Sequence, residues 1–285
     1  PKPSSAASDV YKRQILLTCL GVTLHAETQN NFYVYPTHWW AGMHHNQLSL
    51  LLRSTDQPIG VPKMKASVNT PNIRINRIRS LENTHYVQMD ITILPAARAG
   101  NYTFQFGPDP AGKMQQFVYS LQQREGGNGQ HRIQGVTSRD LTYLILADRF
   151  ANGDTSNDAF SDMRDPASDR NSKFARHGGD LKGIQDRLDY FIELGVTTLW
   201  FTPLTENDMP RTREGNFDIA GYHGYWFTDH YQIDKRFGGN EAYRSFVNAA
   251  HQKGLKVIQD AIYNHIGLYH WMNQSPPARD WINQW

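Results

Sequence analysis

The sequence contains a single cysteine, Cys19, among 285 residues. One cysteine cannot form an internal disulfide, which excludes a disulfide-stabilised scaffold and a cysteine-rich metal site. An excess of charge of one sign is also missing, because 29 basic side chains are balanced by 27 acidic ones and leave a formal net charge of +2. This balance lacks the electrostatic footprint of a nucleic-acid-binding protein, so nucleic acid is not an expected partner.

The apolar run at residues 15–26 is too short to cross a membrane, which requires about 20 residues, and no transmembrane segment is expected. The run ends at the small residue Ala26 and is followed by a polar segment, as in a secretory signal cleaved before Glu27. We therefore predict a secreted or periplasmic protein. Two alternatives are a lipoprotein acylated at Cys19, for which Thr18 is a poor preceding residue, and an ordinary buried segment.

Residues 1–14 carry neither an initiating methionine nor the basic start of a signal peptide. Residues 9–14 can be translated from a transposon end used in sequencing-library preparation, so we treat residues 1–14 as a non-native leader, as a hypothesis. Resequencing the locus with its flanking DNA tests this hypothesis, and an intact upstream gene that encodes these residues would refute it.

The chain is 39% hydrophobic and 12% aromatic, enough to bury the cores of roughly two domains. Between residues 30 and 124, apolar and polar residues alternate in short runs such as Tyr86–Ile93, separated by turn residues at 99–101 and 107–110. This pattern predicts a small antiparallel β-sandwich of the immunoglobulin-like kind. A glycine-rich stretch then predicts a linker at residues 125–137.

Residues 138–285 show a different pattern, in which apolar strands alternate with helices. Nearly continuous apolar strands are predicted at residues 141–147, 196–201 and 255–261, as expected where both faces of a parallel sheet are covered. Helical periodicity at 184–194 and 242–253 separates them. The alternation predicts a barrel or a doubly wound sheet.

Polar and aromatic residues follow the second and third of these strands. A sugar ring packs its C–H face on an aromatic side chain, and its hydroxyl groups require hydrogen-bond donors and acceptors. We therefore predict a carbohydrate-binding site made of four residues: His223, Tyr225, Asp260 and His265. Taken singly, each of these residues is also explained by a structural role, such as a helix cap, a satisfied histidine or aromatic core packing.

The motif Asp260-Ala-Ile-Tyr-Asn-His265 closely resembles the first signature region of the α-amylase family of glycoside hydrolases, and Tyr222-His-Gly-Tyr-Trp226 resembles the aromatic segment that precedes it. The front segment with Trp39-Trp40-Ala-Gly-Met43 resembles the extra N-terminal domain of the cyclomaltodextrinase and neopullulanase branch, in its exported bacterial form. The resemblance extends from about Tyr33 onward. It implies a β-sandwich followed by the first part of a (β/α)8 TIM barrel, truncated after about three strands.

The resemblance implies a retaining hydrolase of α-glucans such as cyclodextrins, pullulan, starch or maltooligosaccharides. It implies that His265 donates to the hydroxyls of the glucose at the cleaved position and that Asp260 organises the surrounding hydrogen bonds. Tyr225 would stack on a sugar and His223 would donate to it. Family members carry the nucleophile and the acid/base on the fourth and fifth barrel strands, so we assign no catalytic residue here and expect an inactive N-terminal fragment. Related enzymes often dimerise through the sandwich, so a homodimer is expected of the complete protein.

The polar loop Asp148-Arg-Phe-Ala-Asn-Gly-Asp-Thr-Ser-Asn-Asp158, followed later by Gly178-Gly-Asp180, resembles the calcium loop near the start of the barrel in cyclodextrin-processing members of the family. Calcium takes six to eight oxygen ligands from carboxylates, amides and carbonyls. Without cysteine, and with only His177 nearby, a transition metal fits this loop less well. The alternative is a solvated polar turn. The predicted structural calcium ligands are Asn152, Asp154, Asn157, Asp158, Gly178 and Asp180.

Two other classes of function are weighed against the enzyme. The first is a non-catalytic carbohydrate-binding protein built on an amylase-like barrel; a downstream Gly-x-Arg-x-Asp strand end and a later catalytic glutamate would favour the enzyme instead. The second is an unrelated barrel enzyme that acts on phosphorylated substrates. No glycine-rich phosphate loop is present in the sequence, although such loops often follow late strands. Substrate preference and the choice between hydrolysis and transglycosylation stay open.

Overall fold

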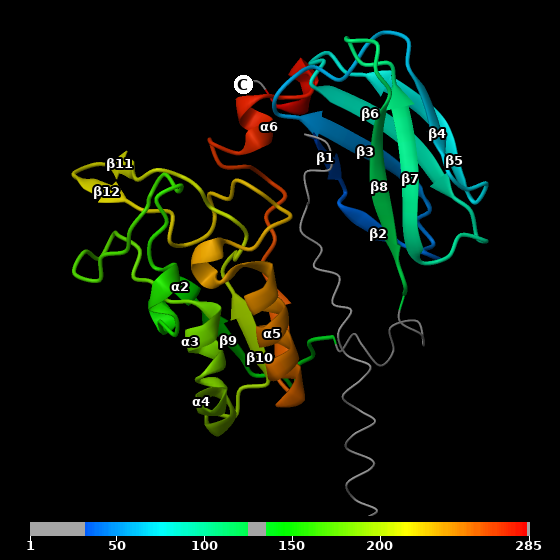
Figure 1. The fold of residues 1–285 in the computed structure, drawn as a ribbon. Helices are drawn as coiled ribbons and strands as arrows, with labels where there is room; N and C mark the ends of the chain where they lie inside the picture. The colour runs from blue at the N-terminus through cyan, green and yellow to red at the C-terminus, as the bar shows by residue number, and fades with distance from the viewer. Residues whose placement is uncertain (1–31, 125–134, 284–285) are drawn as a thin grey trace, which may run out of the picture. The chain divides into compact units, whose positions relative to one another are not determined.

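The computed structural model describes residues 32–124 and 135–283 (Figure 1). They fall into two units that divide between Gln123 and Arg124, and each unit is described by itself. The predicted leader at 1–14, the export segment at 15–26 and most of the linker at 125–137 lie outside the described residues. Within the described ranges, no helix has the length and apolar character needed to cross a membrane.

The first unit is a sandwich of two four-stranded sheets, with strand orders β1-β3-β6-β5 and β2-β8-β7-β4. Neighbouring strands are antiparallel except for the parallel pair β2 and β8. The strands are β1 (Phe32–Tyr35), β2 (His38–Trp40), β3 (Gln47–Ser54), β4 (Lys65–Val68), β5 (Ile73–Ser80), β6 (Tyr86–Ile93), β7 (Gly100–Gly107) and β8 (Gln115–Gln122).

The core of the sandwich explains the alternating sequence. In β6, Val87, Met89 and Ile91 are fully buried, whereas the intervening polar residues are only partly covered. Successive side chains of a strand point to opposite faces, so this period-two burial places one face of each sheet against the other. In the core, the rings of Phe104 and Phe117, which are opposite each other on β7 and β8 of one sheet, stack with centroids 5.0 Å apart. The predicted β-sandwich is confirmed.

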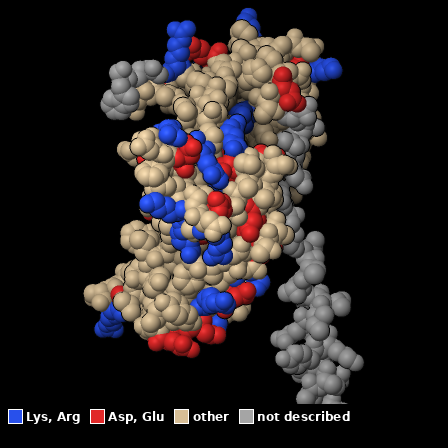
Figure 2. All heavy atoms as spheres, turned by 90° about the vertical axis from the view of Figure 1, so that its left-hand side faces the viewer, with Lys and Arg blue, Asp and Glu red and all other residues tan. Residues whose placement is uncertain are grey.

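The surface carries both signs of charge. Figure 2 shows Lys and Arg interspersed with Asp and Glu on one face of the molecule. This distribution agrees with the near balance of acidic and basic residues in the sequence.

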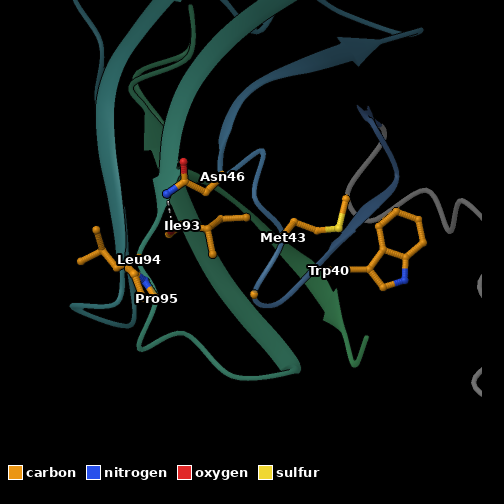
Figure 3. A pocket seen from close by; sticks show the side chains of 7 residues that line it. Trp40, Met43, Asn46, Ile93, Leu94 and Pro95 are labelled. Atoms are coloured by element: carbon orange, nitrogen blue, oxygen red, sulfur yellow. Dashed lines mark hydrogen bonds between the residues drawn. The ribbon is translucent and has the colours of Figure 1, made fainter. Parts of the chain in front are cut away.

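A pocket of about 220 Å³ lies in the first unit, beside the segment that follows β2 (Figure 3). The residues that line it include Trp40, Met43, Ile93 and Pro95. The amide of Asn46 donates a hydrogen bond to the carbonyl of Ile93 at 3.1 Å. The pocket is therefore formed between the Trp39–Met43 motif and the end of β6.

The second unit is built on an open parallel sheet of three strands, in the order β13-β10-β9. Its strands are β9 (Thr142–Ile145), β10 (Thr198–Phe201) and β13 (Lys256–Gln259), with a separate hairpin of β11 (Thr212–Glu214) and β12 (Phe217–Ile219). Its helices are α2 (Ala147–Phe150), α3 (Leu181–Gln185), α4 (Leu188–Glu193), α5 (Gly239–Gln252) and α6 (Trp271–Gln274), with 3₁₀ helices η2 (Thr155–Asn157), η3 (Lys235–Phe237) and η4 (Arg279–Trp281). The described strands form no closed barrel, as expected of its first part.

The two faces of the three-stranded sheet differ in burial. On one face, Leu199 and Phe201 are buried in a core with residues of α3, α4 and α5, and Phe201 packs edge-to-face on Phe246 at 5.2 Å. Alternate residues point the other way. There, Leu144 is 54% exposed and Trp200 is 39% exposed, in register with each other and with Ile258. This row is an apolar sheet face that the described residues leave largely open.

Candidate functional site

The predicted site residues lie on two loops that follow neighbouring strands. The segment after β10 carries His223 and Tyr225, and the segment after β13 carries Asp260 and His265. Because β10 and β13 are parallel and adjacent, their carboxyl ends lie at the same edge of the sheet. The topology therefore allows the two segments to meet at this edge of the sheet.

Tyr225 contacts each of the other three predicted residues. The Tyr225 hydroxyl donates to Oδ2 of Asp260 at 3.2 Å, and Nε2 of His265 lies 2.9 Å from the Tyr225 carbonyl oxygen. The ring of His223 stacks beside that of Tyr225, with centroids 5.8 Å apart and an interplanar angle of 22°. His265 is exposed and the other three are partly exposed, so a ligand can reach them. Their grouping is a feature of the structure, and their role in binding sugar stays a prediction.

Gly224 explains how His223 and Tyr225 are held in the site. Its φ of +87° lies in the left-handed region, where side chains other than hydrogen are disfavoured. A Cβ atom there would also lie 2.0 Å from the carbonyl oxygen of Pro203, shortly after β10. The close approach to this backbone oxygen fixes the turn, and it requires glycine.

The electrostatics of the site favour a neutral, hydroxyl-rich ligand. Burial, assisted by the nearby positive charge of Arg176, lowers the pKa of His223, so its imidazole is neutral at pH 7. Its Nδ1 accepts the Tyr225 N–H at 3.0 Å, which assigns its proton to Nε2. Burial and the adjacent Asp260 raise the pKa of Tyr225, which keeps its hydroxyl a donor. The site therefore combines neutral donors with one carboxylate acceptor.

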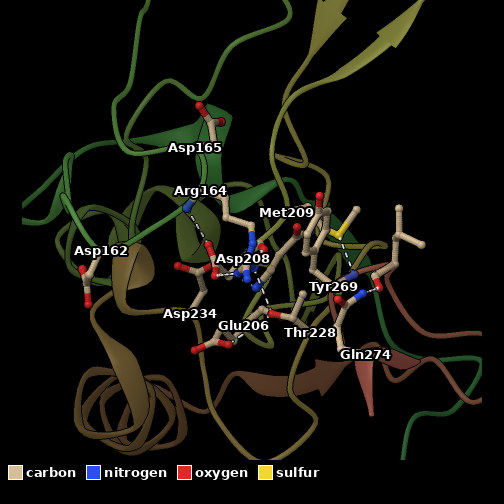
Figure 4. A network of polar contacts seen from close by, with 12 residues as sticks. Asp162, Arg164, Asp165, Glu206, Asp208, Met209, Thr228, Asp234, Tyr269 and Gln274 are labelled. Atoms are coloured by element: carbon tan, nitrogen blue, oxygen red, sulfur yellow. Dashed lines mark hydrogen bonds and ion pairs between the residues drawn. The ribbon is translucent and has the colours of Figure 1, made fainter. Parts of the chain in front are cut away.

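A buried ionic cluster lies beside these segments (Figure 4). Asp234 is fully buried and accepts hydrogen bonds from Nε and Nη2 of Arg236 at 2.9 and 2.7 Å. Burial alone would raise the pKa of Asp234, but the hydrogen bonds and charge of Arg236 outweigh it and lower that pKa to about 2. Asp234 also accepts the Asn207 N–H at 3.1 Å, and the Asn207 amide donates to the Gly221 carbonyl at 2.9 Å. The cluster thus supports the start of the segment that carries His223.

No pattern in the sequence marks this cluster. The charged stretch at residues 162–170 has no helical or strand period and is typical of a solvated loop, and Asp162 is exposed as that interpretation requires. Asp165 is different, because it is buried and accepts a hydrogen bond from Nε of Arg211 at 2.9 Å. The interpretation of this stretch as solvated is therefore wrong at Asp165. Only the proximity of arginines distant in sequence marks the difference.

Glu206 is a further acidic residue near the site, and its pKa is shifted. Its side chain accepts a hydrogen bond from the Thr228 hydroxyl at 3.1 Å. Burial and the nearby Asp229 raise the pKa of Glu206. These contacts give it a structural role, and no catalytic role is assigned to it.

The predicted calcium loop is organised by Asp180. Its fully buried carboxylate accepts hydrogen bonds from the backbone N–H groups of Gly153, Asp154 and Gly183 at 2.6–3.1 Å. It also accepts from Nδ2 of Asn157 at 3.2 Å. Asp180 therefore caps α3 and closes the loop, which accounts for its burial without a metal.

Three neighbouring side chains fit a hard cation better. Among the described residues, Oδ1 of Asn152 and Oδ1 of Asn157 are buried without a hydrogen-bond partner. Burial raises the pKa of Asp158 despite a 2.7 Å hydrogen bond from Asn152, and the charge of Asp180 raises it further, so a cation here would relieve repulsion. Gly178 is required, because a Cβ there would lie 2.2 Å from Oδ1 of Asp158.

Asp154 fits the predicted calcium site less well. It is exposed, and its Oδ1 accepts from the N–H and the hydroxyl of Ser156 at 3.0 and 2.6 Å. No three His, Cys, Asp or Glu side chains in the described ranges gather as a metal-binding group. A cation would therefore depend on amide and carbonyl oxygens around Asp158, which calcium accepts.

Comparisons with known proteins match both units. Residues 144–284 match the family model of the α-amylase catalytic domain, and residues 33–125 match that of the cyclomaltodextrinase N-terminal domain. Neopullulanase 2 of Thermoactinomyces vulgaris is 41% identical over 133 residues, which cover 45% of this chain and 20% of the relative. The cyclomaltodextrinase of Thermoanaerobacter pseudethanolicus is 37% identical over 131 residues, 46% of this chain and 20% of the relative.

A third relative, the periplasmic α-amylase of Escherichia coli, is 36% identical over 128 residues, which cover 44% of this chain and 19% of the relative. The matches thus span about a fifth of the length of these three curated relatives.

Proposed function

Because residues 144–284 belong to the α-amylase catalytic-domain family and residues 33–125 to the cyclomaltodextrinase N-terminal family, we propose that the chain forms part of the glucan-binding cleft of an exported α-glucan hydrolase. The observation that carries the proposal is the joint contact of His223, Tyr225, Asp260 and His265. The names neopullulanase and cyclomaltodextrinase support pullulan and cyclodextrins as substrates, whereas starch and maltooligosaccharides rest on the resemblance of the sequence motifs alone.

In the proposed complex, a glucose ring packs its C–H face on the ring of Tyr225. The Nε2–H of His223 donates to a sugar hydroxyl, and His265 offers the ring nitrogen that does not contact the Tyr225 carbonyl. Asp260 accepts from a hydroxyl while it keeps Tyr225 in place through the 3.2 Å hydrogen bond. These contacts orient an uncharged sugar without forming a covalent bond to it.

Retaining cleavage additionally needs a carboxylate nucleophile and a carboxylic acid about 5–5.5 Å apart across the glycosidic bond. We assign neither role to Asp260 or Glu206, because the first pairs with Tyr225 and the second with Thr228. Both catalytic groups are proposed to come from the later strands of the family's barrel. The chain by itself is therefore proposed to bind α-glucans without cleaving them.

This proposal predicts that the full chain releases no detectable reducing ends from cyclodextrin, pullulan or starch under conditions in which a complete cyclomaltodextrinase does. Robust turnover by the chain would overturn the proposal.

The open sheet face at Leu144 and Trp200 predicts that the chain enhances the fluorescence of a hydrophobic dye. Replacing Leu144 with asparagine should reduce the dye signal, whereas Val118→Asn, an exposed position in the sandwich, should not.

We also propose a structural calcium ion held by Asn152, Asn157 and Asp158, with the Gly178 carbonyl completing the set. The buried, unpartnered amide oxygens of the two asparagines support it. Adding calcium at about 100 times its Kd should raise the melting temperature of the second unit by about 5 °C, and a chelator should reverse the change.

The matched variants for the calcium measurement are Asp158→Asn and Asp186→Asn. Asp158→Asn should abolish the response, whereas Asp186→Asn should keep it, because Asp186 pairs with Lys182 on the surface. A melting temperature that ignores both calcium and chelator would support the solvated polar turn instead.

Export and dimerisation belong to the same proposal. Export is supported by the signal-like sequence at residues 15–26, which lies outside the described residues, and by the periplasmic α-amylase among the relatives. A homodimer of the complete protein remains a prediction from the resemblance.

A further inference from the structure

Two histidines beside the predicted sugar site form a pair that this site does not use. Nε2 of His270 lies 3.2 Å from Nδ1 of His230, and His270 is fully buried. The ring of Phe227 packs edge-to-face on both, with centroids 4.4 Å from His230 and 6.1 Å from His270. We name the pair His230 and His270 the histidine clasp.

The hydrogen bonds around the histidine clasp fix its protons. Nδ1 of His270 accepts the backbone N–H of Met272 at 3.1 Å and so caps α6, which assigns the proton of this ring to Nε2. That proton is donated to Nδ1 of His230, whose own proton is therefore on Nε2, beside the backbone of Ile262. In both rings, Nδ1 already accepts a hydrogen bond. A proton added to either ring turns an acceptor into a donor and breaks one of these bonds.

The histidine clasp joins the two segments that carry the sugar site. His230 follows Tyr225 by five positions, and His270 follows His265 by five. Between them, the Gly267 N–H donates to the Phe227 carbonyl at 2.9 Å, and the His270 N–H donates to the Gly267 carbonyl at 2.9 Å. The two segments are therefore joined by a backbone hydrogen bond and, beside it, by the side-chain hydrogen bond of the clasp.

We propose that the neutral histidine clasp is a positioning pair for the glucan site, which holds the Tyr225 and His265 segments together and releases them when a proton is added. Its effect on sugar binding rests on the proposed function. Its effect on the two segments does not.

The direction of the pH dependence follows from the surroundings of the clasp. His230 keeps an exposed edge, and the partial desolvation of its ring lowers its pKa below the ordinary value of 6.5, against the hydrogen bond with Ile262, which raises it. Because the folded state disfavours the charged ring, the contribution of neutral His230 to stability is fully present above pH 6.5. It is lost as the pH falls from 6.5 through the lower pKa of His230 in the folded state. The Asp229 carboxylate beside His230 accepts the Tyr231 N–H at 2.7 Å. The other titratable groups at residues 222–231 and 260–270 are Tyr222, His223, Tyr225, Asp229, Tyr231, Asp260, Tyr263, His265 and Tyr269. From other elements, Glu206 lies near Asp229 and Arg164 lies over the ring of Tyr269.

Hydrogen exchange of the full chain at pH 7.5 and pH 5, corrected for the intrinsic exchange rates, tests the proposal at residues 266–275. We expect at least a tenfold loss of protection at pH 5 relative to pH 7.5. His270→Gln keeps a group at the Nε2 position that can donate or accept, and it should stay protected at both pH values. His270→Asn keeps the helix cap but not the reach to His230, and it should be unprotected at both.

Equal protection of the wild type at both pH values would overturn the proposal, as would His270→Gln behaving like His270→Asn. Far-UV circular dichroism of each variant confirms that it is folded. Titration with maltotriose forms the second arm, and its affinity should follow the same pH pattern. The expected exchange pattern without maltotriose binding at either pH would support the clasp and contradict the proposed function.

Discussion

Replacing Asp234 with alanine is expected to lower the free energy of unfolding of the second unit by about 3–5 kcal/mol, which is the usual effect of removing one partner of a buried ion pair. Asp234 is completely buried, and its carboxylate accepts from Arg236 and from the backbone N–H of Asn207. Without it, Arg236 and the neighbouring Arg176 keep their charges in the interior with less compensation. Such a loss is a large share of the 5–15 kcal/mol of an ordinary domain.

Urea unfolding followed by tryptophan fluorescence measures this effect. Asp162→Ala is the matched control, because Asp162 pairs with Lys235, the residue next to Arg236, but is exposed to solvent. Exposed ion pairs contribute little to stability, so the control should unfold close to the wild type. Equal unfolding midpoints for the two variants would show that the buried cluster does not stabilise the unit.

The acid dependence of the Asp234 contribution has a definite sign. The folded pKa of Asp234, about 2, is lower than the ordinary value of 3.8. The stabilisation is therefore fully present above pH 3.8 and is lost as the pH falls from there towards 2. The unfolding midpoints of wild type and Asp234→Ala should accordingly converge in acid.

The sheets of both units could be predicted from the sequence because burial follows a simple period. Strand β6 alternates as a half-buried strand does, and the parallel strands are short apolar runs. The predicted helix at 184–194 is instead two helices, α3 and α4, because the chain leaves helical geometry at Arg187, where φ is −115° and ψ is 16°. The spacing of the apolar residues does not show this break, because the apolar residues of both helices are buried in one core.

The candidate site was predicted from the types and order of its residues, whereas its support was not. His223 and Asp260 are recognisable from their motifs, and the structure brings them together through Tyr225. Asp165 and the histidine clasp have no such signal. Asp165 pairs with Arg211, 46 positions later, and His230 pairs with His270, 40 positions later. Charge and imidazole content alone do not show which residues pair across such distances in sequence.

Replacing Tyr225 with alanine is expected to reduce the affinity for maltotriose by about 10–100-fold, equivalent to ~1.4–2.7 kcal/mol. The change removes the aromatic surface for the sugar and the hydroxyl that orients Asp260. Tyr190→Ala is the control, because Tyr190 is a partly exposed tyrosine on α4 and belongs to no predicted site. Isothermal titration calorimetry of the two variants measures the difference, and equal affinities would remove Tyr225 from the site.

The most direct test of a single glucose-binding site is a maltotriose titration of the full chain labelled with ¹³C at Cε1 of histidine, followed by NMR. We predict that the His223 and His265 resonances shift with one common midpoint and that the exposed His44 in the sandwich does not shift. In Tyr225→Ala, the midpoint should move to a maltotriose concentration about 10–100-fold higher. Resonances of His223 and His265 that do not move, or that move with different midpoints, would contradict the account.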